Sequence, residues 1–155
     1  MISLRKKASQ CAAAALLLLS LLTATACTSR SRQQFLRRPV DALEKGQIIR
    51  LTDAILAAGG SDTVRFGRLH TGEIAVVQLW IANQTKHPIL LSDYRRSCGC
   101  TMLEFDTQPI RAGEAQCVSL TFDSRGEWGW QLKTVDLIVT GANRPLRLYV
   151  EAEIE

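Results

Sequence analysis

The sequence predicts an all-β protein, an antiparallel two-sheet sandwich of about seven strands, with an export signal and a short tether before it. Two observations predict the fold: apolar and polar residues alternate along several short stretches, and turn-forming residues separate these stretches. Alternation gives each strand one buried side and one solvent-facing side, which is typical of packed sheets. A third observation, an apolar run near the N-terminus, predicts the export signal.

The first residues have the three parts of a bacterial signal peptide. Residues 5–7 are basic, and residues 11–22 form an apolar run broken by one serine. Residues 24–26, Ala-Thr-Ala, supply the small side chains that a signal peptidase requires. The run of 12 residues is shorter than the ~20 that a membrane-spanning helix needs. We therefore expect residues 1–26 to be a signal peptide.

Cys27 directly follows this cleavage site, at the position where bacterial lipoproteins carry their lipid. The leucine that usually stands three residues before that cysteine is replaced by Ala24, which also suits ordinary signal peptidase. Two outcomes remain open. The protein is lipid-anchored to the inner or outer membrane and faces the periplasm or the surface, or it is a soluble periplasmic or secreted protein. Either outcome places it outside the cytoplasm, and in the first the lipid makes the membrane a partner.

Charge is unevenly distributed along the chain. Residues 27–46 are polar and basic without periodicity, which favours a tether behind the lipid-attachment cysteine. Residues 47–155, the predicted domain, carry 11 Lys and Arg against 13 Asp and Glu, a net charge of −2 against +4 for the whole chain. Nucleic-acid-binding domains need a basic surface for the phosphate backbone. We therefore expect no nucleic-acid partner.

The stretch from Val40 to Ile55 allows two interpretations. Three apolar residues, Val40, Leu43 and Ile48, could lie on one face of a short helix, whereas residues 47–51 suit a first strand equally well. Both interpretations stay open. The later strands are expected at residues 64–69, 74–82, 88–94, 117–122, 135–139 and 146–154.

The cysteines are the residues most suited to chemistry. Once the signal is removed and the lipid attached, three thiols remain: Cys98, Cys100 and Cys117. An odd number in an oxidising compartment makes one disulfide and one free thiol a natural outcome. Cys98 and Cys100 can form a small, exchange-prone disulfide with each other. Alternatively, one of them joins Cys117 across the sandwich while Gly99 allows a tight bend, or both bind a soft metal.

A metal site would need further ligands, because zinc is usually held by four. Besides Cys117, the candidates are His70 and His87, which lie beside turn residues and are more typical of exposed turns. We therefore expect no cofactor, with copper or zinc as the alternative. The sequence has no order of residues typical of serine hydrolases or phosphate-binding loops. We expect no enzymatic activity, although Arg95 and Arg96 would favour a reactive thiolate at the nearby cysteines.

Three tryptophans allow structural or binding roles. Trp128 and Trp130 flank Gly129, so they could cap one end of the core or form a contact surface for a sugar or a protein. Trp80 lies in the middle of a long predicted strand and is expected to pack in the core or on a sheet face.

Several short motifs carry a family resemblance. They are, in order, Phe66-Gly67, Gly72-Glu73, Ile81-Ala82-Asn83, Pro88-Ile89, Ser97-Cys98-Gly99-Cys100-Thr101, Pro109-Ile110, Ala112-Gly113-Glu114, Leu120-Thr121-Phe122-Asp123 and Gly126. From about Val64 to Ile154 this order resembles the bacterial domain of unknown function 1573, a family abundant in Bacteroidota that often carries lipoprotein signals. The resemblance implies an immunoglobulin-like sandwich and supplies no reaction. The chain departs from the family pattern at Gly141-Ala142-Asn143 and in the loop enlarged by Trp128 and Trp130.

These features predict a non-enzymatic envelope lipoprotein that acts as an immunoglobulin-like module for protein interaction or assembly. Its partner is then another envelope protein. The alternatives are a soft-metal or thiol–disulfide protein that uses Cys98 and Cys100, and a carbohydrate-binding module that uses Trp128 and Trp130.

Overall fold

A computed structural model describes residues 36–43 and 46–155. The expected signal peptide, the expected lipid-attachment residue Cys27 and the first part of the tether lie outside the described residues. The elements are β1 (Arg37–Pro39), η1 (Val40–Ala42), β2 (Gln47–Leu51), α2 (Asp53–Ala58), β3 (Gly60–Leu69), β4 (Ile74–Asn83), β5 (Leu91–Arg96), β6 (Thr101–Glu104), β7 (Glu114–Asp123), β8 (Gly129–Val139) and β9 (Leu146–Ile154). Within the described part of the chain, no helix has the length and apolar character to cross a membrane.

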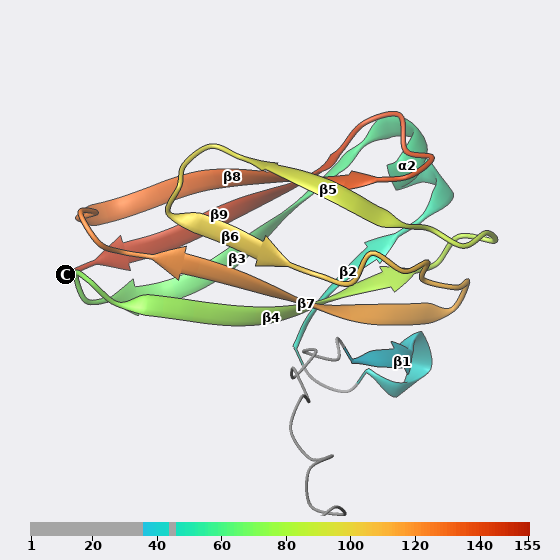
Figure 1. Ribbon diagram of the computed structural model, residues 1–155, viewed down its shortest axis with the longest axis horizontal. Helices are drawn as coiled ribbons and strands as arrows, with labels where there is room; N and C mark the ends of the chain where they lie inside the picture. The colour runs from blue at the N-terminus through green and yellow to red at the C-terminus, as the bar shows by residue number, and fades with distance from the viewer. Residues whose placement is uncertain (1–35, 44–45) are drawn as a thin grey trace, which may run out of the picture. The chain divides into compact units, whose positions relative to one another are not determined.

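Two sheets pack face to face, which confirms the all-β sandwich (Figure 1). Sheet A has the order β1-β7-β4-β2, and β6 also pairs with β7; sheet B has the order β3-β9-β8-β5. The expectation of antiparallel pairing throughout is wrong at two places, because β2 pairs with β4, and β3 with β9, in parallel. Parallel neighbours need a long connection between them. Local sequence patterns therefore do not reveal such pairs.

The core forms between the inner sides of the two sheets, as the alternating pattern predicts. Val118, Leu120 and Phe122 on β7 are fully buried. On sheet B, Leu148 and Val150 are also inaccessible to solvent. Full burial of such a side chain stabilises a fold by about 1.5–3 kcal/mol. The remaining inner positions follow the same alternation, so the core fixes which residues of each strand face outward.

Of the two alternatives for the stretch from Val40 to Ile55, the strand is confirmed and the helix through Val40, Leu43 and Ile48 is wrong, because η1 ends at Ala42 and Ile48 lies in β2. Residues 47–51 form strand β2, and helix α2 follows it. The Thr52 side chain accepts a hydrogen bond from the backbone N–H of Ile55, at 3.3 Å, and so caps the helix. Gly59 then ends the helix with a φ of 85°, a conformation that glycine adopts at little cost.

The end of the expected tether is part of the fold, so the prediction of a tether up to residue 46 is wrong for this part. Strand β1 pairs antiparallel with the first residues of β7, beside the position where β6 ends. Val40, Leu43 and Ile48 pack on a second, smaller cluster on the outer side of sheet A. Trp80 lies in this cluster, so it packs on a sheet face. A pairing of three residues is too short to produce a periodic signal in sequence.

Strand β6 was not predicted. It covers four residues and pairs with the second half of β7. Because β5 belongs to sheet B and β6 to sheet A, the residues between them cross from one sheet to the other at one end of the sandwich. These residues contain the Cys-Gly-Cys motif.

Candidate functional site

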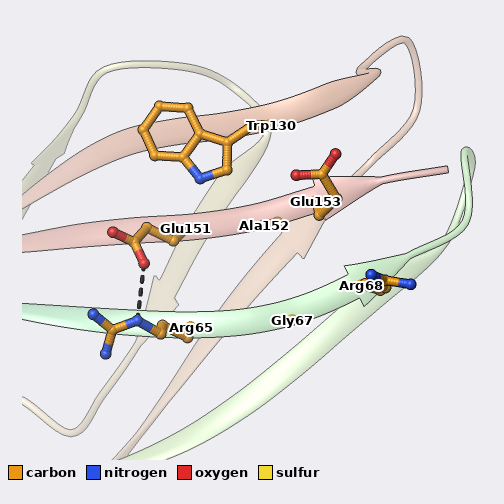
Figure 2. A pocket seen from close by; sticks show the side chains of 7 residues that line it. All are labelled: Arg65, Gly67, Arg68, Trp130, Glu151, Ala152 and Glu153. Carbon is orange, nitrogen blue, oxygen red and sulfur yellow. Dashed lines mark hydrogen bonds and ion pairs between the residues drawn. The ribbon is translucent and has the colours of Figure 1, made fainter.

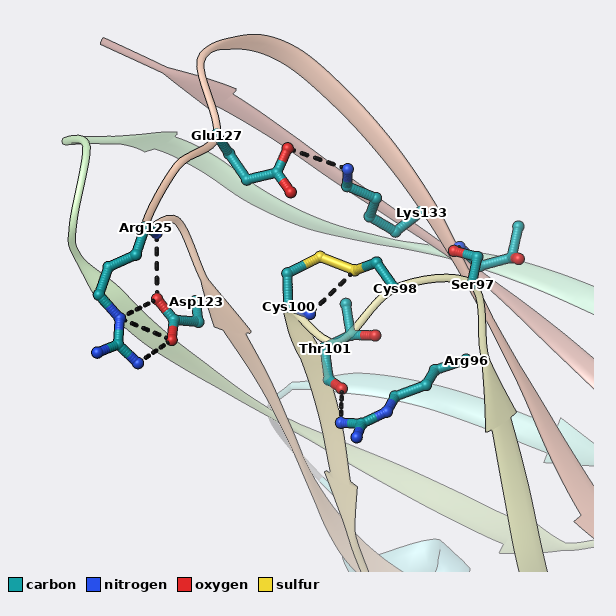
Figure 3. Close-up of a disulfide and its surroundings, with 10 residues drawn as sticks. Arg96, Ser97, Cys98, Cys100, Thr101, Asp123, Arg125, Glu127 and Lys133 are labelled. Carbon is teal, nitrogen blue, oxygen red and sulfur yellow. Dashed lines mark hydrogen bonds and ion pairs between the residues drawn. A yellow bond between two sulfur atoms is a disulfide. The ribbon is translucent and has the colours of Figure 1, made fainter.

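The Cys-Gly-Cys turn holds a disulfide between neighbours in the chain (Figure 3). Cys98 and Cys100 are joined, with their Cα atoms 5.3 Å apart, and both side chains are half-buried. Cys117 is a free, buried thiol. The structure thus contains one disulfide and one free thiol among the described cysteines.

Hydrogen bonds from both sheets fix this turn independently of the disulfide. On the side of sheet B, the Ser97 N–H donates to the Thr134 carbonyl, and the Thr134 N–H donates to the Ser97 hydroxyl, each at 2.9 Å. On the side of sheet A, the Asp123 N–H donates to the Cys100 carbonyl at 2.8 Å. The Arg96 guanidinium also donates to the Thr101 carbonyl at 2.7 Å (Figure 3).

The disulfide itself contributes little to the stability of the fold. Loop-closure entropy gives about 1.5 kcal/mol for a loop this short, compared with about 3 kcal/mol for a 15-residue loop. Gly99 is not among the glycines with positive φ, and a Cβ added there would meet no atom outside residues 98–100 within 4 Å. The interpretation that Gly99 serves to allow a tight bend is therefore wrong.

Cys117 lies too far away to join this pair. Cys117 faces outward on β7, opposite Trp80 on β4. It lies six residues before Asp123, whose backbone N–H donates to the Cys100 carbonyl. Six residues of strand span roughly 20 Å. Burial raises the pKa of the Cys117 thiol, and the positive charge of Arg38 offsets part of that rise. The alternative of a disulfide across the sandwich through Cys117 is therefore wrong.

The histidines do not join the cysteines. His70 and His87 are both exposed, His70 at the turn after β3 and His87 in the loop before β5. Among residues 36–43 and 46–155, no three His, Cys, Asp or Glu side chains are grouped so that they could hold a metal ion. A copper or zinc site at Cys98 and Cys100 would thus have these two sulfurs alone from the described residues, after reduction.

A depression of about 230 Å³ lies on the outer side of sheet B (Figure 2). Three neighbouring strands each supply one kind of side chain: β3 supplies guanidinium groups, β9 carboxylates and β8 an indole. The lining residues are Arg65, Gly67, Arg68, Trp130, Glu151, Ala152 and Glu153. The register sets Trp130 directly opposite Glu153, so the indole stands beside the carboxylates.

A β-bulge in β3 brings both arginines to this face. Arg65 pairs with Glu151 and Arg68 with Glu153, so three steps along β3 match two steps along β9. Residues three apart in a regular strand would face opposite sides of the sheet. Gly67, with a φ of 74°, accommodates the extra residue. The sequence does not mark Arg65, Arg68, Glu151 and Glu153 as one site, because nothing in the local pattern indicates the bulge or the parallel pairing.

Ion pairs fix part of the charge in the depression. Arg65 Nε lies 2.9 Å from a Glu151 carboxylate oxygen, and Arg68 lies 3.3 Å from Glu155. Within the described residues, Glu153 has no basic group at ion-pair distance and is exposed to solvent. The depression therefore presents an apolar ring beside a carboxylate open to a partner's cation or hydrogen-bond donor.

The two tryptophans near β8 differ in position. Trp130 is 61% exposed and lines the depression, whereas Trp128 is 81% exposed in the preceding loop and does not line it. The interpretation that they cap the core is therefore wrong for both residues. As a contact surface they remain a prediction.

The family model for a protein of unknown function, DUF1573, matches residues 58–154, which is more than half of the chain. The chain belongs to the DUF1573 family. The matched range contains the Cys-Gly-Cys turn and every residue that lines the depression. It leaves β1, η1, β2 and most of α2 outside the matched DUF1573 region.

Solved structures resemble this DUF1573 protein in fold. A crystal structure of a protein of unknown function from Porphyromonas gingivalis W83 superposes with a TM-score of 0.52 at 19% identity, covering 74% of this chain and 50% of that one. The VesB protease of Vibrio cholerae gives a TM-score of 0.50 at 12% identity, covering 60% of this chain and 30% of that one. The chain thus spans half or less of these proteins, and the likeness concerns the fold alone. A search of curated proteins found no match.

Proposed function

We propose that this DUF1573 protein is a lipid-anchored module of the bacterial cell envelope whose main role, the binding of another envelope protein, needs no catalysis. The observation that carries the proposal is the open tryptophan: Trp130 exposes most of its ring beside a depression rather than burying it in the core. Tryptophan and arginine are the residues most enriched among those that dominate protein–protein binding energy. The depression presents both on one sheet.

The chemistry of the depression favours a particular kind of partner. An apolar or aromatic side chain of the partner would cover the Trp130 ring, and a Lys or Arg beside it would meet the exposed carboxylate of Glu153. Arg65 is already paired with Glu151 and keeps that carboxylate in place. We therefore expect the partner segment to combine an apolar anchor with a basic residue.

Site-specific photo-crosslinking tests the binding surface. A photoreactive amino acid replaces Leu132, which is exposed on β8 two residues after Trp130, in the full chain produced in living cells. The control position is Gln78, exposed on the outer side of sheet A. We expect a discrete adduct with one envelope protein from position 132 and none from position 78. Equal adducts from both positions, or none from either, would contradict the proposal.

Trp130→Ala in the position-132 variant should abolish the protein adduct. An envelope polysaccharide whose retention depends on Trp130, with no protein adduct, would instead support carbohydrate binding. The two outcomes differ in the molecule that is recovered.

The anchor has its own test at Cys27. We expect the intact mass to match a mature protein that begins at Cys27 and carries a diacylglyceryl group. The substitution Cys27→Ser should move the protein from the membrane fraction to the soluble fraction. A mature protein without lipid that starts at the same residue would support the soluble alternative.

A further inference from the structure

We infer that the Cys98–Cys100 disulfide is a thiol–disulfide exchange site, in which Cys98 is the attacking sulfur and Cys100 the resolving sulfur. Its substrate class is a disulfide of another exported protein or peptide. This activity goes beyond the proposed docking role and depends on other residues, so each can fail without the other.

Opening the disulfide leaves the fold in place. Ser97 is bound to Thr134 on β8, and the Cys100 carbonyl is bound to the Asp123 N–H on β7. None of these bonds involves sulfur. Because the closed loop is also very short, reduction releases little chain entropy. The pair can therefore alternate between dithiol and disulfide within a folded domain.

The surroundings of the two sulfurs differ in a way that assigns their roles. The backbone N–H of Cys100 donates to Cys98 Sγ at 3.2 Å. A hydrogen bond to the charged form of a group stabilises that form, so a Cys98 thiolate has a donor already in position. Cys100, by contrast, packs against the main hydrophobic core, where a thiolate is poorly solvated. Cys98 is thus the thiolate and nucleophile, and Cys100 acts second.

The residue between the two cysteines places no side chain over the turn. Gly99 is exposed, and no atom outside residues 98–100 lies within 4 Å of the position that its Cβ would occupy. Because its φ is not positive, the turn does not itself require glycine. An incoming disulfide therefore meets no side chain at this position.

The exchange has two steps. In the reduced pair, the Cys98 thiolate attacks one sulfur of the substrate disulfide, forms a mixed disulfide and releases a substrate thiolate. The Cys100 thiolate then attacks Cys98 Sγ, which forms the observed Cys98–Cys100 bond and releases the second substrate thiolate. Two electrons pass to the substrate, and its two thiolates take up the two protons that the cysteines lost. A dithiol donor regenerates the reduced pair by the same steps in reverse.

Exchange with oxidised glutathione, used as the disulfide probe, tests the assignment. The full chain is reduced with dithiothreitol without denaturant, desalted and mixed with the probe, and peptide masses after an acid quench report each cysteine separately. We expect the first glutathione adduct at Cys98, forming at least about ten-fold faster than at the buried thiol of Cys117, a ratio equivalent to about 1.4 kcal/mol in activation free energy. The adduct should then give way to the Cys98–Cys100 disulfide.

Matched variants separate the two sulfurs. Cys100→Ser should accumulate the adduct at Cys98, Cys98→Ser should slow the first step at least about ten-fold, and Cys117→Ser should change neither step. Circular dichroism of the reduced parent should match that of the oxidised parent. Equal rates for Cys98→Ser and Cys100→Ser, or a pair that dithiothreitol reduces only in denaturant, would overturn the inference.

Discussion

The outer sides of the two sheets each carry a tryptophan, and they differ in what covers it. On the outer side of sheet A, Trp80 is 9% exposed, and the Arg38 guanidinium lies 5.7 Å from the centre of its ring. Cys117 packs in the same cluster. On the outer side of sheet B, Trp130 is 61% exposed. The Cys98–Cys100 turn likewise lies at the surface.

The difference indicates which residues serve the fold and which are available for binding and chemistry. The chain uses β1 and η1 to cover Trp80 and Cys117, and it supplies no described segment to cover Trp130. Covered residues contribute to stability through the contacts that they make within the chain. Open residues contribute little to stability, so their substitution tests function without unfolding the domain.

Trp80→Ala should give the largest effect on stability. The substitution removes a nearly buried indole from beneath η1 and leaves a cavity, which typically costs about 3–5 kcal/mol for such residues. Urea unfolding followed by circular dichroism measures the loss. A loss below about 0.5 kcal/mol, typical of surface substitutions, would mean that the covered region is not structural.

Replacing both Cys98 and Cys100 by serine should have a smaller effect. We expect a loss of about 1.5 kcal/mol in the free energy of unfolding, because only a very short loop loses its closure. The same urea titration measures it, with Cys117→Ser as the comparison for a buried thiol. A loss as large as that of Trp80→Ala would show that the disulfide is a structural staple.

The smallest effect is expected from the surface ion pair between Asp136 and Arg147, on the same outer face as Trp130. The hydrogen bond from Arg147, at 2.7 Å, holds the pKa of Asp136 below its usual range, and the charge of Arg95 adds to this. A carboxyl whose pKa is lowered by folding stabilises the folded state above its unfolded pKa, about 3.9, and loses that contribution as pH falls through the folded pKa. Asp136→Asn should therefore lower the urea midpoint slightly at pH 7, and this difference should shrink as the pH falls below about 3.9.

The covered core could be predicted from sequence because it depends on local alternation. Within the stretch 146–154, every second residue is buried, as the sequence pattern predicts. Strand β1 could not be predicted, because three residues give no period. The depression also escaped prediction, since it requires the bulge at Gly67 and the parallel pairing of β3 with β9. Trp130 itself was recognised, but its surroundings come from strands distant in the chain.

The most direct test of the proposed role compares stability with binding for the Trp130→Ala variant, once photo-crosslinking from position 132 has identified the partner. We predict a free energy of unfolding within about 0.5 kcal/mol of the parent. The affinity for the partner should fall at least about ten-fold, since a central tryptophan commonly contributes more than 1.4 kcal/mol to binding. Trp128→Ala, outside the depression, should change neither quantity. Unchanged affinity for the Trp130→Ala variant, or a loss of stability as large as that of Trp80→Ala, would contradict the account.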